Sequence, residues 1–465
     1  MIDGLKPYPA MKDSGVPWLG EVPEHWEVRR LKHVCAMRSG DGITAEAINA
    51  DGDYPVYGGN GRRGFTSSFT HDGEFPLVGR QGALCGNVHL ARGQFWASEH
   101  AVVASPESGV SPSFLAQALR ILDLRQYSIA AAQPGLAVER ILTLPAPLPP
   151  LPEQAAIVRF LDHADRRIRR YIRDKQKLIK LLEEQKQAII HRAVTRGLDP
   201  NVRLKSSGVE WLGDVPEHWE VTRLKNVAAV QTGLTLGKDY RSAKTKRYPY
   251  LRVANVQTGR VDLRTVKEVE VPEAEARRSM LRAGDVLMTE GGDIDKLGRG
   301  CVWSGEIAEC LHQNHVFAVR CGLRLLPAFL AGLMASNHGR AYFQTTAKQT
   351  TNLAATNSTT LRAFPLVLPD VAEQEHVLSW IATETEALVR AAADADREIA
   401  LLREYRTRLI ADVVTGKLDV REAAARLPDE VPEAETEDDL DEVAEGDDAA
   451  GPESDIDTEP ENEAA

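Results

Sequence analysis

One segment of the chain occurs twice. Residues 14–32 (SGVPWLGEVPEHWEVRRLK) return as residues 207–225 (SGVEWLGDVPEHWEVTRLK), with 16 of 19 positions identical. An internal repeat this close indicates that one unit was duplicated. The chain is therefore predicted to contain two versions of one unit in tandem.

Two shorter motifs follow each copy of this segment. Residues 144–154 (LPAPLPPLPEQ) correspond to residues 364–374 (FPLVLPDVAEQ), and residues 193–199 (AVTRGLD) correspond to residues 413–419 (VVTGKLD). Both pairs are separated by the same offset of 220 positions. The stretch between the two motifs therefore has the same length in both halves.

These two stretches have the period of long helices. In residues 153–196 and 373–418, apolar residues alternate at spacings of four and three, which is the pattern of a coiled-coil seam. Each helix would be about 65 Å long at a rise of about 1.5 Å per residue. The predicted seam consists of Ile157, Leu161, Ile168, Leu178, Leu182 and Ile189 in the first helix and of Val377, Ile381, Leu388, Leu402 and Leu409 in the second.

The charges of the two helices favour their pairing with each other. Residues 153–196 carry 12 basic and 6 acidic side chains, whereas residues 373–418 carry 6 basic and 9 acidic ones. Opposite net charges favour this pair over self-pairing. We predict an antiparallel coiled coil within the chain. The alternative is that each helix packs only on its own domain.

The regions between the helices, residues 33–143 and 226–363, differ in length by 27 residues and show little similarity. Gly-rich turns between β-branched and aromatic runs predict strands, and short amphipathic stretches predict helices. We therefore expect an α+β protein with an internal pseudo-two-fold repeat. Its globular domains are expected at residues 1–149 and 198–369, its long helices at 150–197 and 370–419, and an acidic tail at 428–465.

The net charge of −12 is unevenly distributed. Residues 428–465 contain 18 Asp or Glu residues and no Lys or Arg, so residues 1–427 carry a net charge of +6. A mildly basic body permits a nucleic-acid partner. The tail is predicted to be disordered. A solvating segment is the simpler interpretation of the tail, and a mimic of DNA charge is the alternative.

Cysteine usage and hydropathy indicate the compartment. The five cysteines include no CxxC pair, which fits a reducing cytoplasm. The beginning of the chain has no apolar run, and no stretch approaches the length of a membrane span. We expect a soluble cytoplasmic protein.

Motifs for catalysis or metal binding are weak. The loop that starts at Gly233 resembles a phosphate loop, but it is one residue short and Asp239 replaces the hydroxyl residue that would hold magnesium. A group of Cys and His residues fits no zinc-ligand spacing, and its strand-like alternation favours buried side chains. This group consists of Cys301, Cys310, His312, His315 and Cys321. The sequence thus predicts a non-catalytic chain that holds no metal or cofactor.

Basic and amide side chains gather on Gly-rich loops of both unlike regions. Arg, Asn and Gln are the side chains that read base edges, while Lys mostly contacts phosphate. These residues are therefore candidate DNA contacts, although each could equally be a solvated surface residue. The candidates are Asn60, Arg62, Arg63, Arg80, Gln81 and Asn87 in the first region and Lys244, Lys246, Arg247, Arg252, Asn255, Lys296, Arg299, Gln313, Asn314 and Lys348 in the second.

The repeated SGVxWLGxVPEHWEVxRLK segment, the LPxxxEQ entry to each long helix and the VTxxLD exit resemble the specificity subunit of type I restriction–modification systems. The loops YPVYGGNGRRGFTSSF and MTEGGDIDKLGRG look like two different types of target-recognition domain. The resemblance covers residues from about 14 to 420, and the acidic tail lies outside it.

This resemblance implies a function. Two target-recognition domains would each read one half of a split site in double-stranded DNA, and the paired helices would hold them apart. The subunit would dock two adenine-N6 methyltransferase subunits that carry S-adenosylmethionine. Motor–nuclease subunits that use ATP and magnesium would join them, and no membrane would be involved.

Two other classes of function remain open. The chain could be a coiled-coil scaffold of a related DNA-defence complex, or a nuclease that uses Glu184 and Lys186. Salt-sensitive, sequence-selective DNA binding would exclude the scaffold, and metal-dependent cleavage by this chain alone would support the nuclease. The repeated tryptophans are interpreted as core residues rather than as a docking surface. They are Trp18, Trp26, Trp211 and Trp219.

Overall fold

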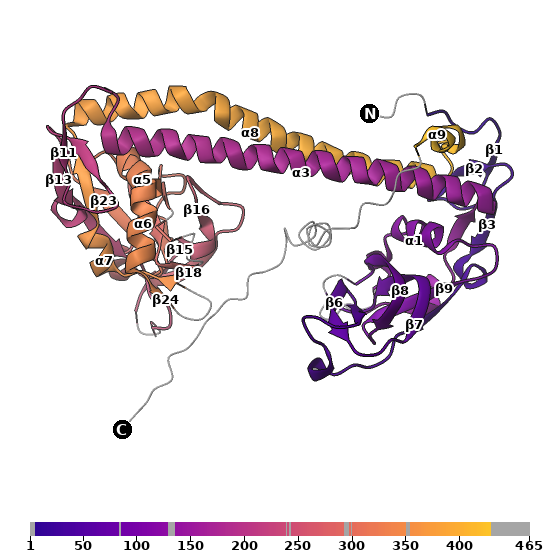
Figure 1. The fold of residues 1–465 in the computed structure, drawn as a ribbon. Coiled ribbons are helices and arrows are strands. Elements are labelled where there is room, and N and C mark those ends of the chain that lie inside the picture. Colours follow the sequence, from indigo (N-terminus) through magenta and orange to yellow (C-terminus); the bar gives the residue numbers. More distant parts are fainter. Residues whose placement is uncertain are drawn as a thin grey trace. The chain divides into compact units, whose positions relative to one another are not determined.

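The fold is described from a computed structural model. The chain forms two compact units. Unit 1 comprises Met1–Ile172 and Ala400–Ala465, and unit 2 comprises Arg173–Ile399. Each unit holds a globular part and one end of each of two long helices (Figure 1). The structure describes residues 5–82, 85–128, 135–238, 240, 243–292, 297–298, 300–349 and 354–428.

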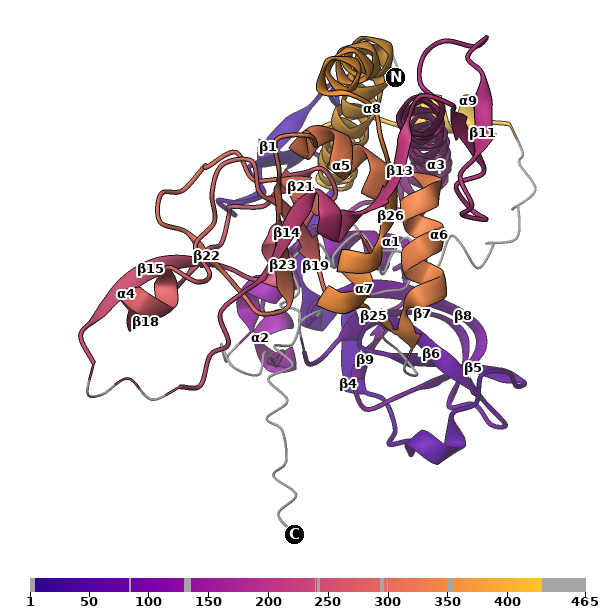
Figure 2. The same cartoon turned by 90° about the vertical axis from the view of Figure 1, so that its left-hand side faces the viewer.

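The long helices α3 (Leu151–Arg196) and α8 (Val371–Val414) lie side by side in both views (Figures 1 and 2). In unit 1, Ile157 near the start of α3 shares an apolar cluster with Val413 at the end of α8. In unit 2, the order is reversed, because the end of α3 shares a cluster with the start of α8. The two helices therefore pair in antiparallel directions.

Ion pairs link the two helices within each unit. Arg406 contacts Asp165 in unit 1, and Lys175 contacts Glu398 at 2.6 Å in unit 2. The basic partner is on α8 in the first pair and on α3 in the second. Since both pairs are partly exposed to solvent, they add little free energy to the pairing of the helices.

The buried seam agrees with the predicted one at the ends of the helices. Ile157, Leu161, Ile168, Val377 and Leu409 are buried. Leu178 was assigned wrongly, because its side chain is 41% exposed. After Ile168 the next buried position is Ile172, four residues on, which moves the seam out of the heptad phase that Leu178 requires. The half-buried members are Leu182, Ile189, Ile381, Leu388 and Leu402.

A six-stranded sheet forms the globular part of unit 1. Its strand order is β4-β9-β7-β8-β5-β6, and all neighbours are antiparallel except β5 and β8. The strands are β4 (Cys35–Ser39), β5 (Tyr54–Gly58), β6 (Gly61–Thr66), β7 (His71–Gly79), β8 (Val88–Ala97) and β9 (Ala101–Pro106). The short helices are η1 (Leu31–His33), η2 (Ala45–Ala47), α1 (Pro112–Arg120), η3 (Leu124–Tyr127) and α2 (Val138–Ile141).

In unit 2, the strands form several smaller sheets. The larger two have the orders β14-β23-β19-β21 and β18-β15-β22. The strands are β14 (Ala228–Thr232), β15 (Thr245–Leu251), β16 (Val256–Gln257), β17 (Arg260–Val261), β18 (Lys267–Pro272), β19 (Val286–Thr289), β20 (Gly291–Gly292), β21 (Gly300–Val302), β22 (Leu311–His312), β23 (Val316–Cys321), β24 (Lys348–Gln349) and β25 (Ala354–Ala355). The helices are η4 (Leu224–Asn226), η5 (Val253–Asn255), α4 (Glu273–Ala276), α5 (Pro327–Ala335), α6 (Asn337–Thr346) and α7 (Ser358–Ala363).

The two globular parts share one arrangement of strands and helix, which we call the frame. The sequence did not reveal this similarity. In unit 1, β4 pairs with β9 and β9 pairs with β7; in unit 2, β14 pairs with β23 and β23 with β19. Each part also contains one parallel pair, β5–β8 or β15–β22. A helix that begins with proline, α1 or α5, follows β9 or β23. The duplication therefore extends through the regions whose sequences show little similarity.

The repeated segments fold alike in both units. Each forms a small hairpin and a second antiparallel pair with the strand that precedes the long helix. The pairs are β1 (Met11–Asp13) with β2 (Glu21–Pro23), β3 (Glu27–Arg30) with β10 (Pro145–Leu148), β11 (Leu204–Ser206) with β12 (Asp214–Pro216), and β13 (Glu220–Arg223) with β26 (Pro365–Leu368). A last short helix, α9 (Arg421–Arg426), follows α8.

A buried glutamine ties the globular part of unit 1 to α3. Gln154 Oε1 accepts a hydrogen bond from the backbone N–H of Ser111 at 2.7 Å. Its Nε2 donates to the carbonyls of Gly109 at 3.0 Å and Pro149 at 2.8 Å. Since the side chain is 0% exposed, these bonds satisfy a polar group that has no access to water. The start of α1 is thereby fixed on the start of α3.

Gln374 makes the same three bonds in unit 2. Its Oε1 accepts from the backbone N–H of Leu326 at 2.8 Å, and its Nε2 donates to the carbonyls of Arg324 and Pro369 at 2.8 and 2.9 Å. We call Gln154 and Gln374 the glutamine clamps. They explain why the LPxxxEQ motif recurs in front of each long helix.

The glutamate before each clamp contacts the repeated histidine, and in unit 1 it also bonds to the repeated tryptophan. Glu153 accepts from Trp26 Nε1 at 2.8 Å and lies 2.6 Å from His25 Nε2. In unit 2, Glu373 lies 3.0 Å from His218 Nε2. The first and second repeated motifs are thus joined by side-chain contacts in both units.

The repeated tryptophans differ in burial. Trp26 and Trp219 are 0% exposed, as we predicted for core residues. Trp211 is half-buried and packs against Tyr342. Trp18, in contrast, is 44% exposed. The core interpretation therefore holds for the tryptophan next to the histidine in each copy.

We predict that Gln154→Leu lowers the free energy of unfolding of unit 1 by about 2–4 kcal/mol, because it removes three hydrogen bonds of a buried amide and leaves the N–H of Ser111 and the carbonyls of Gly109 and Pro149 without this partner. Urea unfolding would measure the loss, and hydrogen exchange would show faster exchange of the Ser111 amide. Gln176→Leu, at an exposed position of α3, is the matched control and should change neither. An unchanged exchange rate at Ser111 would contradict the role of the clamp.

Candidate nucleic-acid interface

Three turns of unit 1 meet at one edge of its sheet. The backbone N–H of Arg80, which follows β7, donates to the carbonyl of His100 in the β8–β9 turn at 2.9 Å. The β5–β6 turn approaches both, because a Cβ on Gly59 would lie 3.2 Å from the His100 carbonyl and 3.6 Å from that of Gln81. The predicted contacts Asn60, Arg80 and Gln81 are therefore brought together.

The remaining candidates of unit 1 lie beside these turns. Arg62 and Arg63 are exposed on β6, and the guanidinium of Arg62 stacks 5.1 Å from the ring of Phe65. Asn87 precedes β8, and its carbonyl accepts from the backbone N–H of Gly79. The six candidates thus belong to the ends of β5 to β8 and form one polar edge.

The corresponding edge of unit 2 is built around the turn between β22 and β23. Asn314 donates its backbone N–H to the carbonyl of Leu234, and the N–H of Glu290 bonds to the carbonyl of His315 at 2.8 Å. The bond between Glu290 and His315 repeats the bond between Arg80 and His100. The two units therefore hold equivalent turns with different side chains.

A glycine allows each of these turns to approach the first strand. A Cβ on Gly40 would lie 2.2 Å from the carbonyl oxygen of Ala97, and a Cβ on Gly233 would lie 2.2 Å from that of Gln313. Real Cβ atoms do not come so close to backbone, so only glycine fits at these positions. The Gly233 loop, which resembles a phosphate loop, is thus a close crossing of two backbone segments.

Two histidines in these turns were not among the candidate DNA contacts. His100 and His315 occupy equivalent positions, and their side chains are 45% and 55% exposed. His315 Nδ1 lies 2.7 Å from a carboxylate oxygen of Glu290, and His100 Nε2 lies 3.2 Å from one of Glu99. The shared signal is a histidine directly before an apolar strand, β9 or β23. Either imidazole can donate to or accept from a base edge.

Some candidates of unit 2 have other partners. Asn255 is 4% exposed; it accepts from the N–H of Arg252 and donates to the carbonyls of Asp262 and Thr265. The structure gives Asn255 a structural role, and we withdraw it as a DNA contact. Gln313 Oε1 accepts from the N–H of Val253 at 3.3 Å, so part of its amide is also engaged.

Two basic candidates of unit 2 face carboxylates. Lys246 Nζ lies 2.6 Å from Glu309, and Arg247 Nε lies 3.9 Å from Glu270. Contacts from these side chains to phosphate would have to replace the ion pairs. Lys244 and Lys348 are exposed, and Arg252 is half-buried. Lys296 and Arg299 lie outside the described residues.

The Cys and His group of unit 2 is mostly buried. His312 is 0% exposed, and its Nδ1 lies 2.7 Å from the carbonyl of Val316, to which it donates when neutral. Burial raises the pKa of the Cys301 and Cys310 thiols to about 12. Within the described part of the chain, no three His, Cys, Asp or Glu side chains are grouped as metal ligands. Nor does any helix there combine the length and apolar character needed to cross a membrane.

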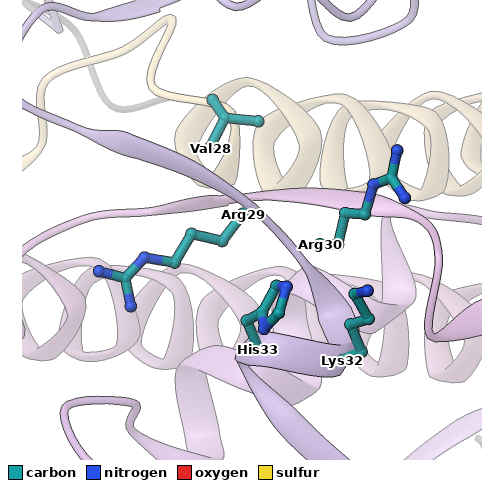
Figure 3. Close-up of a pocket in the computed structure, with 5 residues that line it drawn as sticks. All are labelled: Val28, Arg29, Arg30, Lys32 and His33. Carbon is teal, nitrogen blue, oxygen red and sulfur yellow. The ribbon is translucent and has the colours of Figure 1, made fainter.

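A shallow basic hollow lies on the repeated segment of unit 1 (Figure 3). It is lined by Val28, Arg29, Arg30, Lys32 and His33 from β3 and η1. The side chains of Arg29 and Arg30 extend to different sides of β3, and Lys32 and His33 lie beneath them. In unit 2 the matching segment has Thr222 and Asn226 in place of two of these basic residues. The hollow is therefore more basic in the first copy.

The fold and these turns define a class of protein. It is a duplicated α+β chain in which two equivalent frames present different sets of polar turns. Comparison with known proteins gives a family match for part of the chain. Residues 23–181 match the family model of the type I restriction modification DNA specificity domain. The resemblance inferred from the repeated motifs is thereby confirmed.

Individual relatives cover parts of the chain. The EcoprrI specificity subunit of Escherichia coli is 42% identical over 141 residues, which are 30% of this chain and 35% of that protein. The EcoKI specificity subunit of Escherichia coli strain K12 is 24% identical over 239 residues, 50% of this chain and 48% of that protein. The matches thus span about a third to a half of the length of these relatives.

One solved structure agrees with the fold over most of the chain. It comes from a study of complex assembly and conformational transition of the type I R-M system. It covers 85% of this chain and 99% of the compared chain, with a TM-score of 0.58 and 17% sequence identity. At this identity the likeness establishes the fold.

We predict that the stability of unit 2 falls as the pH falls from about 6.5 towards about 4. Burial lowers the pKa of His312 to about 4, so below 6.5 the unfolded chain binds a proton that the folded chain does not. Each such histidine costs up to about 1.4 kcal/mol per pH unit in this window. Urea unfolding at several pH values would show a shallower slope for His312→Asn. His376→Asn, at an exposed position of α8, should keep the wild-type slope.

Proposed function

We propose that the chain is the DNA-sequence-specificity subunit of a type I restriction–modification complex and reads a bipartite target. The observation that carries the proposal is the combination of one frame with two different sets of turns. Two half-sites of unlike sequence need different base contacts on equivalent supports. The chain would supply recognition, and catalysis would belong to its partners.

The repeated segments support docking of two identical partners. Glu24 and Arg30 are exposed in unit 1, and the identical residues Glu217 and Arg223 are exposed in unit 2. Core packing does not require identity at exposed positions, whereas a partner that binds both units does. We propose that these partners are two adenine-N6 methyltransferase subunits. S-adenosylmethionine would be bound by these subunits, and ATP and magnesium by motor–nuclease subunits in the cytoplasm.

Single-molecule sequencing of N6-methyladenine in the source genome, with and without the gene, tests this function. Loss of methylation at a split motif with a fixed spacer on deletion would support it. An unchanged methylome would require binding assays with the purified methyltransferase partner. If that complex showed no sequence-selective, salt-sensitive DNA binding, the scaffold function would replace our proposal.

We predict that exchanging residues 33–143 for the same region of a relative changes one half of the methylated motif and leaves the other. Gln154 lies outside the exchanged region and bonds to the backbone of Ser111 and Gly109 inside it, so a graft with the same arrangement of strands and helix keeps this support. Methylome sequencing of the chimaera is the measurement. A change in both halves would contradict independent recognition by the two units.

We predict that Arg80→Ala weakens binding to DNA that carries the correct first half-site by about 10–100-fold, as expected for loss of one base contact. Base substitutions in the other half-site should keep their wild-type effects. Fluorescence anisotropy with the methyltransferase complex would measure both. Arg92→Ala is the matched control, since Arg92 is exposed on β8 and pairs with Glu74 at 2.8 Å.

A further inference from the structure

Three exposed arginines form a stripe along the first part of α3. Arg159, Arg166 and Arg170 are seven and four residues apart, so at about 100° per residue they share one face. The buried Ile157 and Leu161 lie on the opposite face. We call Arg159, Arg166 and Arg170 the arginine stripe. All three belong to unit 1.

The acidic tail starts beside this stripe. Arg159 donates from Nη2 to the carbonyl of Leu427 at 2.7 Å and to that of Pro428 at 3.4 Å. Pro428 is the last described residue of the chain, and it lies in unit 1 like the stripe. The described part of the chain therefore ends at the first arginine of the stripe.

The charges of the tail and the stripe are complementary. Residues 429–440 contain seven Asp or Glu residues and no basic one. In the stripe, Arg159 and Arg166 line a surface hollow together with Asp162 and the start of α1. Asp165 does not offset the stripe, because its carboxylate pairs with Arg169 and Arg406 on the side of α8. Asp162 offsets one of the three positive charges, because its carboxylate lies in the same hollow and interacts with Arg166, so the stripe keeps a net positive charge.

The tail is long enough to follow the stripe. The stripe extends about 16 Å along the helix at a rise of about 1.5 Å per residue. Twelve extended residues reach about 40 Å. A tethered segment of this length acts at an effective concentration on the order of millimolar, so weak contacts suffice for docking.

We propose that residues 429–440 dock on the arginine stripe and act as an intramolecular competitor that keeps other polyanions off this face of α3. Each exposed ion pair is weak, so docking would depend on several pairs together and would weaken with salt. The proposal is independent of the DNA target, because the stripe lies on α3 and not on the turns at the polar edges.

Protease protection tests the docking directly. Glutamyl endopeptidase cleaves after Glu430, Glu433, Glu435 and Glu437, and mass spectrometry of the released C-terminal fragment gives the rate. At about 20 mM sodium chloride we expect cleavage of the full chain about five-fold slower than of a free peptide of residues 429–440, and no difference at about 500 mM. Equal rates at low salt would overturn the proposal.

Matched variants locate the docking site. The triple variant R159Q/R166Q/R170Q should lose the protection, since glutamine keeps helix propensity and removes the charge. The control R29Q/R30Q/K32Q removes the same charge from the basic hollow of the same unit and should keep the protection. Loss of protection in the control alone, or in both variants alike, would overturn the assignment to the stripe.

Binding of a random-sequence DNA duplex tests the competition. Replacement of the seven carboxylates of residues 429–440 by their amides in the full chain should tighten this binding about ten-fold at low salt. In the R159Q/R166Q/R170Q background the same replacement should have no effect. Equal tightening in both backgrounds would show that the tail repels DNA through diffuse charge, and the docking proposal would fail.

Discussion

The glutamine clamps are the interaction on which both units depend. Each places one fully buried amide between the end of a globular part and the first turn of a long helix. An amide has two donor hydrogens and one acceptor oxygen, and Gln154 and Gln374 use both kinds of group in the same way. The contact is directional and cannot be replaced by apolar packing. It therefore fixes how α1 and α5 lie on their helices.

The frame is more conserved between the two units than the sequence is. Gly40 and Gly233 stand where two backbone segments cross, and α1 and α5 both begin with proline. These positions are dictated by backbone geometry, which tolerates few residue types. The exposed turns carry no such constraint, so Arg80 and Glu290 occupy equivalent positions with opposite charge. Equivalent supports with unlike side chains are what reading of two half-sites requires.

Sequence patterns predicted the long helices well because their period repeats over many turns. The bounds of α3 differ from the prediction by one residue at each end, whereas α8 ends at Val414, earlier than predicted. Leu178 was misplaced because the seam leaves the heptad phase after Ile168, a change that depends on the partner helix. Asn255 was misjudged since its burial results from contacts with residues seven and ten positions away. The equivalence of His100 and His315 was not foreseen because it follows from strand pairing.

The end of one long helix is connected to the first hairpin of its unit covalently in unit 2 and through non-covalent contacts in unit 1. In unit 2, the peptide bonds of residues 197–203 join α3 to the next hairpin. In unit 1, the backbone N–H of Asp419 donates to the carbonyl of Lys6, and Arg421 stacks over Tyr8 at 4.9 Å. A pulling force applied to the two ends of the chain would therefore load a few non-covalent contacts in unit 1 first. While these contacts hold, the force does not pass through unit 2, so the contacts of unit 1 set the resistance of the chain to pulling at its ends.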